Sequence, residues 1–227
     1  MNPPVLCRPE AYYKFADSLH CLHTSRGLQK AAVAIAMHAF DDIDPASVDA
    51  HLDALAERVL ARVRRRNPET LIAHLHDVLF DEEQFHGESN NYYSPLNSYL
   101  PAVLATRRGL PITLALTYKF VGERIGLEID GINAPGHFLA RVRDSRGWLL
   151  VDPFHGGKVL TSAEVYALVE RVFNARIQRT PEVLEPATHK QWLTRLLANL
   201  QKVFSEEGCN DDLAAMTELQ SLLDAAR

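Results

Sequence analysis

The first eighty residues carry apolar side chains at the spacing of amphipathic helices. Residues 28–40 are rich in alanine and predict one helix. A second helix is predicted to begin at Pro45, with Asp44 as its N-cap, because proline is tolerated in the first turn of a helix. A third is predicted from Pro68 to about Phe80. The buried stripe of the second helix is predicted to comprise Val48, Leu52, Leu55, Val59, Leu60 and Val63.

Residues 81–97 show no steady hydrophobic period and are dense in glycine, asparagine, serine and proline. They predict a loop that is longer than most connections and unusually aromatic. Long ordered loops often carry function, but a packed surface loop held by Phe85, Tyr92 and Tyr93 is an equal alternative.

Beyond this loop two more helices precede a change from helical to alternating pattern. Two short helices are predicted at 95–107 and 111–125, and the second begins after Gly109 and ends at Gly126. Strands are then predicted at 127–132, 138–142, 148–151 and 158–160. The turn-forming residues 143–147 predict a hairpin between the second and third of these strands. A helix at 162–171 and a helical tail split near Gly208 complete the pattern.

Helices followed by a small antiparallel sheet place the chain in the α+β class. We expect residues 1–80 to form a helical N-terminal region of the same fold, 81–185 the core, and 186–227 a helical hairpin. Leu200, Phe204 and Gly208 have the spacing of a tetratricopeptide repeat, although Gln201 stands in the usual glycine position. One such hairpin cannot build a solenoid groove, so we expect it to cap the main domain.

Composition narrows the possible classes of function. Of 227 residues, 47% are hydrophobic and 23% are charged, and the net charge is −5. An acidic balance argues against a dedicated nucleic-acid binder and gives no reason for attraction to anionic lipid. No apolar stretch is long enough to span a membrane and no secretion signal is visible, so we expect a soluble, cytoplasmic protein. Three widely spaced cysteines do not form a disulfide framework.

One pair of residues on the predicted hairpin has the chemistry of an active site. A hairpin centred on residues 144–145 places His137 directly opposite Asp152, whereas a four-residue turn makes the two diagonal neighbours. In either register the carboxylate would orient the imidazole, fix its tautomer and raise its basicity. A buried polar contact without chemistry is an equal alternative.

Three segments resemble the SirB-type branch of the transglutaminase-like superfamily, namely FHGESNNYYSPLNSYLPAVLATRRGLPITLAL, APGHFLARV and LLVDPFHGGKVL. These bacterial proteins join a transglutaminase-like domain to a tetratricopeptide-like tail. The resemblance, closest over residues 71–160, implies a papain-like core in which a helix packs on a small antiparallel sheet. The superfamily's enzymes carry a cysteine at the start of that helix, a histidine on one strand and an acid on the next. His137 and Asp152 match this histidine and this acid.

The superfamily's cysteine nucleophile has no counterpart in this sequence. The superfamily's Gly-x-Cys corresponds here to Gly109-Leu110-Pro111, and proline has no nucleophilic atom. The sequence therefore predicts a pseudoenzyme with a binding or regulatory role toward an unknown protein or small-molecule ligand. The alternative is a hydrolase or acyl-transfer enzyme in which His137 and Asp152 activate Thr113 or water.

The old active-site groove is expected to be lined by Phe85, Tyr93 and Asn97 together with the His–Asp pair. Arg107 and Arg108 are expected to fix the preceding helix end, to pair with acidic residues 81–83, or to receive a carboxylate ligand. No cofactor and no metal are expected, because the other histidines considered as ligands are scattered: His74, His76, His86 and His155.

Overall fold

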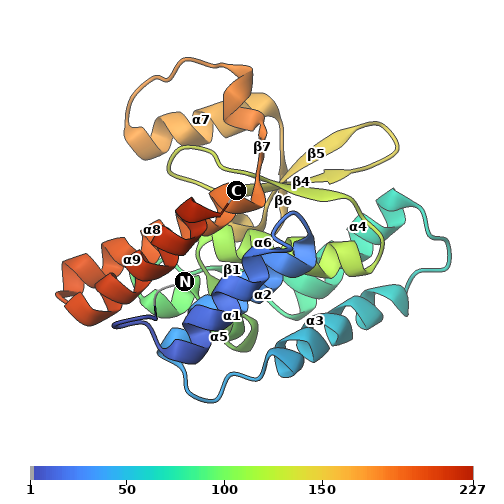
Figure 1. Cartoon of the computed structure of the whole chain (residues 1–227). Coiled ribbons are helices and arrows are strands. Elements are labelled where there is room, and N and C mark those ends of the chain that lie inside the picture. Colours follow the sequence, from blue (N-terminus) through green and yellow to red (C-terminus); the bar gives the residue numbers. More distant parts are fainter. Residues whose placement is uncertain (1–2, 227) are drawn as a thin grey trace.

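The computed structural model describes residues 3–226 and has an α+β architecture (Figure 1). Its centre is a five-stranded antiparallel sheet with the strand order β6-β5-β4-β3-β7. The strands are β3 (Ile129–Ile132), β4 (Leu139–Arg143), β5 (Trp148–Asp152), β6 (Lys158–Leu160) and β7 (Pro186–Ala187). The four strands predicted from alternation are present, whereas the two-residue β7 has too short a pattern to be predicted.

The N-terminal region is helical, as predicted. It comprises α1 (Pro9–Leu19), α2 (Ser25–Ala39), α3 (Pro45–Leu60) and α4 (Pro68–His76). Thr24, Asp44 and Asn67 cap α2, α3 and α4 through side-chain oxygens that accept first-turn backbone N–H groups. The third predicted helix is an α-helix only as far as His76, and residues 77–82 continue it as a π-helical turn, η1 (Asp77–Glu82).

The central helix of the molecule is α6 (Pro111–Arg124). Its residues 111–122 are all buried, because α3, α5 (Leu100–Thr106), α8 (His189–Glu207) and the strands β3 and β4 surround it. The preceding loop contains a short 3-10 turn, η2 (Pro95–Ser98), and a two-residue parallel pairing of β1 (His86–Gly87) with β2 (Arg108–Gly109). This pairing anchors the long loop beside the start of α6 and was not predicted.

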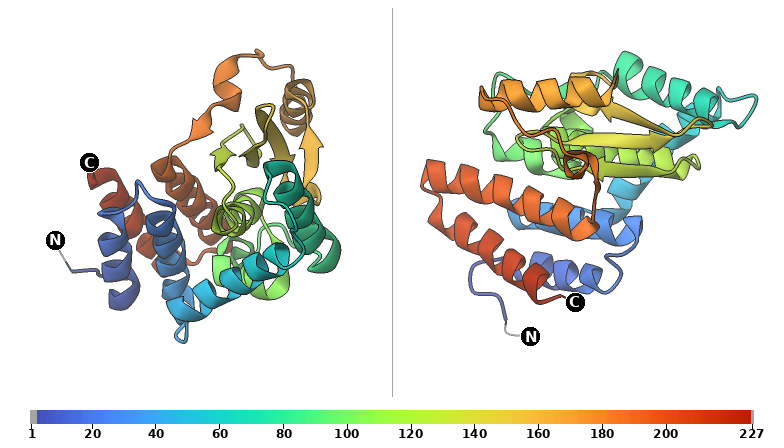
Figure 2. Two further views of the ribbon diagram at one scale, coloured as in Figure 1. Left: turned by 90° about the vertical axis from the view of Figure 1, so that its right-hand side faces the viewer. Right: turned by 90° about the horizontal axis from the view of Figure 1, so that it is seen from above.

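Helices cover both faces of the sheet (Figure 2). α6 packs on one face, and α7 (Ser162–Phe173) covers the other. A separate apolar cluster joins α7 to the sheet through Ile132, Ala134, Leu139, Leu160, Val165 and Val169. The chain returns from α7 through a 3-10 turn, η4 (Pro181–Leu184), to β7.

The tail is the predicted helical hairpin of α8 and α9 (Asn210–Ala225). Gly208 separates the two helices with a φ of 73°, a conformation that glycine adopts without strain. The hairpin packs on α1, α2 and α6, and its apolar residues belong to the main hydrophobic core. Its relation to tetratricopeptide repeats stays a prediction.

No helix within residues 3–226 is both long enough and apolar enough to cross a bilayer.

Candidate functional site

The hairpin of β4 and β5 brings His137 to Asp152. Arg143 pairs with Trp148 and Ala140 with Val151, so the turn contains four residues and the same register sets Asp152 level with Leu139. His137 lies two residues before Leu139 and is therefore the diagonal neighbour of Asp152. Of the two predicted registers, the one with a four-residue turn is thus confirmed, and the directly opposed one does not occur. The reason is Asp144, whose Oδ1 accepts the backbone N–H groups of Arg146 and Gly147, both at 2.7 Å, and so closes the wider turn.

The two side chains form a buried hydrogen bond. Nε2 of His137 lies 3.0 Å from Oδ2 of Asp152, and the residues are 6% and 1% exposed. The other carboxylate oxygen, Oδ1, accepts the backbone N–H groups of Phe154 at 3.1 Å and His155 at 3.3 Å. These bonds cap the 3-10 turn η3 (Pro153–His155) and hold the carboxylate in one orientation.

A second imidazole reaches the same oxygen. Nδ1 of His155 lies 2.7 Å from Oδ2 of Asp152, and the His155 side chain is 54% exposed. Burial alone would raise the pKa of Asp152, but hydrogen bonds and charge from His137 and then His155 hold that pKa below its usual value. Because a carboxylate can only accept hydrogen bonds, Nε2 of His137 donates, and a neutral His137 ring keeps its lone pair on Nδ1.

Phe154 closes the side of the site toward the long loop. Its ring lies edge-on to His137, with 5.8 Å between ring centroids, and 6.2 Å from the ring of Tyr92. A Cβ on Gly87 would lie 2.4 Å from the Phe154 ring, so only glycine allows β1 to approach this closely. Sequence reasoning overlooked Phe154, although it belongs to the motif that carries Asp152.

Among the described residues, Thr113 makes no hydrogen bond to His137. Thr113 is fully buried, and its hydroxyl donates to the backbone carbonyl of Asn97 at 2.9 Å. The Asn97 side chain is also buried, and its amide donates to the carbonyls of Asn91 at 2.7 Å and Tyr92 at 3.2 Å. Both residues therefore fix the long loop to the start of α6 in this structure.

The two aromatic residues predicted to line the groove differ in exposure. Phe85 is 2% exposed and belongs to the hydrophobic core. Tyr93 is 54% exposed, and the Lys202 ammonium of α8 lies 5.1 Å from the centre of its ring. Of these two, only Tyr93 is available to a ligand in this structure.

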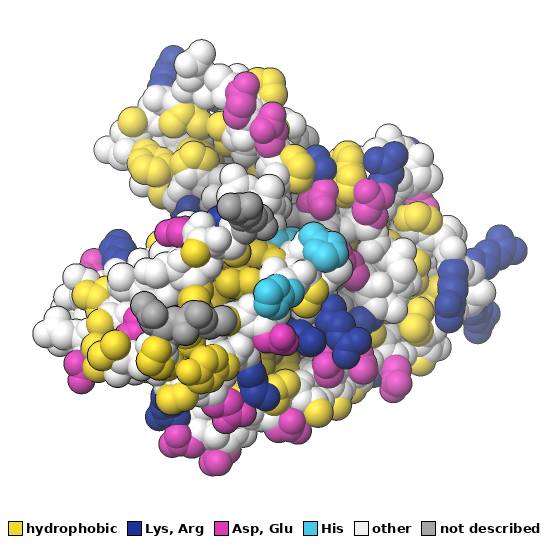
Figure 3. Space-filling model, in the orientation of Figure 1, with side chains coloured by type: hydrophobic (Ala, Val, Ile, Leu, Met, Phe, Trp, Pro, Cys, Tyr) yellow, Lys and Arg dark blue, Asp and Glu magenta, His cyan; other side chains and the backbone are white. Residues whose placement is uncertain are grey.

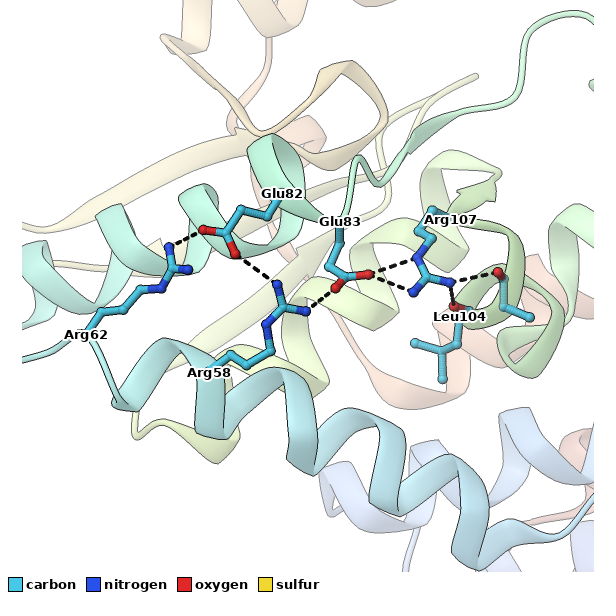
Figure 4. A network of polar contacts seen from close by, with 7 residues as sticks. Arg58, Arg62, Glu82, Glu83, Leu104 and Arg107 are labelled. Atoms are coloured by element: carbon cyan, nitrogen blue, oxygen red, sulfur yellow. Dashed lines mark hydrogen bonds and ion pairs between the residues drawn. The ribbon is translucent and has the colours of Figure 1, made fainter.

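Arg107 adopts the predicted pairing with the acidic segment (Figure 4). It ends α5 in the left-handed conformation, with φ of 61°, and its Nη2 lies 2.7 Å from a Glu83 carboxylate oxygen. Arg58 also contacts Glu83 and bridges to Glu82, so the network joins α3, η1 and the end of α5. Arg108 is exposed.

Three of the four scattered histidines, His74, His76 and His86, have local partners. His74 pairs with Asp77 at 3.1 Å, and Nδ1 of His86 lies 2.5 Å from the Gln84 carbonyl oxygen. His155 is different, because it joins His137 and Asp152 in a cluster that sequence reasoning missed. The available signal was the spacing of Asp152 and His155, three residues apart in one tight turn.

His76 gives the fold a specific dependence on pH. Its Nε2 lies 2.9 Å from the Tyr118 hydroxyl, and burial lowers the pKa of His76 to about 4. In the unfolded chain His76 binds a proton below about pH 6.5, whereas in the folded chain it does so only near pH 4. The free energy of unfolding therefore decreases as the pH falls through this range. Between pH 7 and about pH 4.5, we expect this decrease to be about 2 kcal/mol larger in wild type than in His76→Gln. Urea unfolding of both proteins at the two pH values measures this difference, and parallel losses would contradict the expectation.

Sequence comparison identifies relatives of this chain. A sequence profile of the transglutaminase-like superfamily matches residues 46–198. A UPF0162 protein of Xylella fastidiosa (strain 9a5c) is 32% identical over 78% of this chain and 65% of its own length. UPF0162 protein PA3419 of Pseudomonas aeruginosa is 28% identical over 87% of this chain and 71% of its own length. The chain thus spans slightly less than two thirds of the Xylella relative.

A eukaryotic protein matches a smaller segment. F-box only protein 21 of Mus musculus is 32% identical over 58% of this chain and 21% of its own length. No solved structure matches.

Proposed function

The chain belongs to the transglutaminase-like superfamily, and we propose that it is a non-catalytic member with a binding or regulatory role. The observation that carries this proposal is the proline at position 111, which the match of Gly109-Leu110-Pro111 to the superfamily's Gly-x-Cys motif sets in place of the cysteine. Pro111 is the buried first residue of α6. Its ring occupies a position that suits a helix start and offers no atom that could attack a carbonyl. The three linked motifs further favour the SirB-type branch.

The other candidate nucleophiles do not compensate in this structure. Within residues 3–226, no hydroxyl or thiol is hydrogen-bonded to the His137 ring. Burial, followed by the nearby Glu218 carboxylate, raises the pKa of the Cys7 thiol to about 12, so this residue is not a thiolate. The thiol of Cys21 donates to the Ser18 carbonyl at 3.4 Å, and Cys209 lies at the turn before α9.

A binding role is favoured by the surface beside His137. Val172 and Phe173, at the end of α7, are 52% and 53% exposed. A Cβ on Gly136 would lie 2.5 Å from Cγ1 of Val172, which places this apolar end of α7 against the residue that precedes His137. Figure 3 shows apolar side chains on the α7 lobe and a notch between this lobe and the α8–α9 hairpin. A ligand that covered Val172 and Phe173 would lie beside Gly136, the neighbour of His137.

A second candidate is a hydrolase in which His137, polarised by Asp152, activates water directly. The observation that favours it is the retained hydrogen bond between Nε2 of His137 and Asp152, because it leaves Nδ1 of a neutral ring able to accept a proton. The hydroxyl of Thr113, in contrast, is engaged by the Asn97 carbonyl.

A substrate screen separates the two functions. We expect purified wild type and His137→Ala to hydrolyse or transfer acyl groups from a panel of esters, thioesters and primary amides no faster than buffer does. Tyr13→Ala, a change at an exposed residue of α1 that belongs to no proposed site, controls for trace contaminants from purification. Turnover in wild type and Tyr13→Ala that disappears in His137→Ala would establish the hydrolase and exclude the non-catalytic role.

A further inference from the structure

Three potential metal ligands converge at the end of the β4–β5 hairpin. They are His137, Asp152 and His155, each of which offers one ligand atom within 4.8 Å of the other two. Nε2 of His137 and Nδ1 of His155 both contact Oδ2 of Asp152. They come from different places in the fold: the segment before β4, the last residue of β5 and the turn η3. Among residues 3–226 this is the one group of three such side chains that meets this distance.

The donor set is that of a transition metal. Two imidazole nitrogens and one carboxylate oxygen are ligands of Zn²⁺ and of related divalent ions. The ion would lie about 2.0–2.2 Å from each donor, so the donors would stand roughly 3.3–3.6 Å apart. At present Oδ2 of Asp152 lies 2.7 Å from Nδ1 of His155 and 3.0 Å from Nε2 of His137, so the donors need to move only slightly apart to admit the ion. The exposed His155 can make that movement, and each neutral imidazole then carries its proton on its other nitrogen.

The surroundings hold the ligands and leave one side open. The second oxygen of Asp152 accepts two backbone N–H groups, which orients the carboxylate as outer partners do in metal sites. A cavity of about 220 Å³ opens beside Asp152 and His155, under α7. Its other lining residues include Lys158, Glu164 and Arg171, so a water molecule bound to the ion would lie beside charged side chains of both signs.

We propose that His137, Asp152 and His155 bind one divalent transition-metal ion, for which Zn²⁺ is the appropriate probe, with a further coordination position open toward the cavity under α7. In a chain without a nucleophile, this site would use the His–Asp pair as ligands rather than as a base. The proposal goes beyond the proposed function, and a failure to bind metal would leave that function untouched.

Metal titration of the full chain tests the site. We expect calorimetry with Zn²⁺ to give one equivalent bound per chain, and Co²⁺ to give a visible ligand-field spectrum of a low-coordinate site with nitrogen and oxygen ligands. His155→Ala should weaken binding at least 10-fold, because it removes one of three ligands from an exposed position. His23→Ala, which removes an exposed histidine from another loop, should bind as wild type does. Circular dichroism verifies that both variants are folded.

Asp152→Asn provides a second variant that keeps the side-chain shape and removes the charge, and it should also weaken Zn²⁺ binding at least 10-fold. Three results would overturn the proposal. They are the absence of saturable binding to wild type, equal affinity in wild type and His155→Ala, and a Co²⁺ spectrum with a thiolate charge-transfer band, which would place the ion at a cysteine.

Discussion

Replacing Asp152 with alanine is expected to lower the free energy of unfolding by about 3 kcal/mol, because it removes one partner of a buried charged hydrogen-bond network. Asp152 is 1% exposed and accepts from His137, from His155 and from two backbone N–H groups of η3. The variant leaves the buried Nε2–H of His137 unpaired and removes the cap of η3. Urea unfolding followed by circular dichroism measures the change.

Two further variants test whether the loss of stability is specific to the buried carboxylate of Asp152. Asp152→Asn keeps an oxygen for the η3 cap and should lose about half as much stability. Asp130→Ala removes an ion pair with Arg141 in which the Asp130 side chain is 35% exposed, and should cost less than about 1 kcal/mol. If Asp152→Ala proved no more destabilised than Asp130→Ala, the carboxylate would not organise this end of the hairpin.

Truncation of Trp192 should be at least as damaging, with an expected loss of about 4 kcal/mol. Trp192 is 1% exposed and lies on α8, and its ring centroid is 4.3 Å from that of Phe138, the residue after His137. A Cβ on Gly131 would lie 2.0 Å from the Trp192 ring, so the ring packs directly against the backbone of β3 at this glycine. Trp192→Ala would leave a large cavity between the tail and the sheet.

Chemical denaturation of Trp192→Ala and Trp148→Ala tests this interpretation. Trp148 is partly exposed, and the guanidinium carbon of Arg141 lies 4.1 Å from the centre of the Trp148 ring. Truncation of Trp148 should therefore cost about 1 kcal/mol. Similar losses for the two variants would show that the tail does not depend on this contact with the sheet.

Much of the fold follows from local sequence signals. Asp44 and Pro45 start α3 as a cap and a first-turn proline do elsewhere, and Gly208 ends α8. The alternating segments became β3, β4, β5 and β6. The pairing of β1 with β2 has only two residues on each side, too few to show a period, and depends on Phe154 packing over Gly87. Contacts between distant segments, rather than local preference, create it.

The candidate site was predictable in part. The motifs indicated His137 and Asp152, but the register between them depended on the turn that Asp144 closes. The position of His155 depends on η3, a turn that exists because Asp152 caps it. The roles of Thr113 and Asn97 are set by their contact with each other, sixteen positions apart, which no periodic pattern reveals.

The most direct test of the central claim is to restore the missing nucleophile. In Pro111→Cys the new thiol would stand at the N-terminus of α6, which packs against η3 and β4. There the helix dipole and the His137 imidazole should stabilise a thiolate, so alkylation by iodoacetamide should proceed below about pH 7 instead of near the ordinary thiol pKa of about 8.5. Mass spectrometry of the peptide that carries position 111 separates this thiol from the three native cysteines.

The account predicts that adding His137→Ala to Pro111→Cys shifts this alkylation profile upward by at least about one pH unit. It also predicts that the same addition leaves the labelling of Cys21 unchanged. A thiol at position 111 that is unreactive in the folded protein, or that titrates identically with and without His137, would contradict it. In that case His137 and Asp152 would not be the remainder of an active site that lacks only its nucleophile.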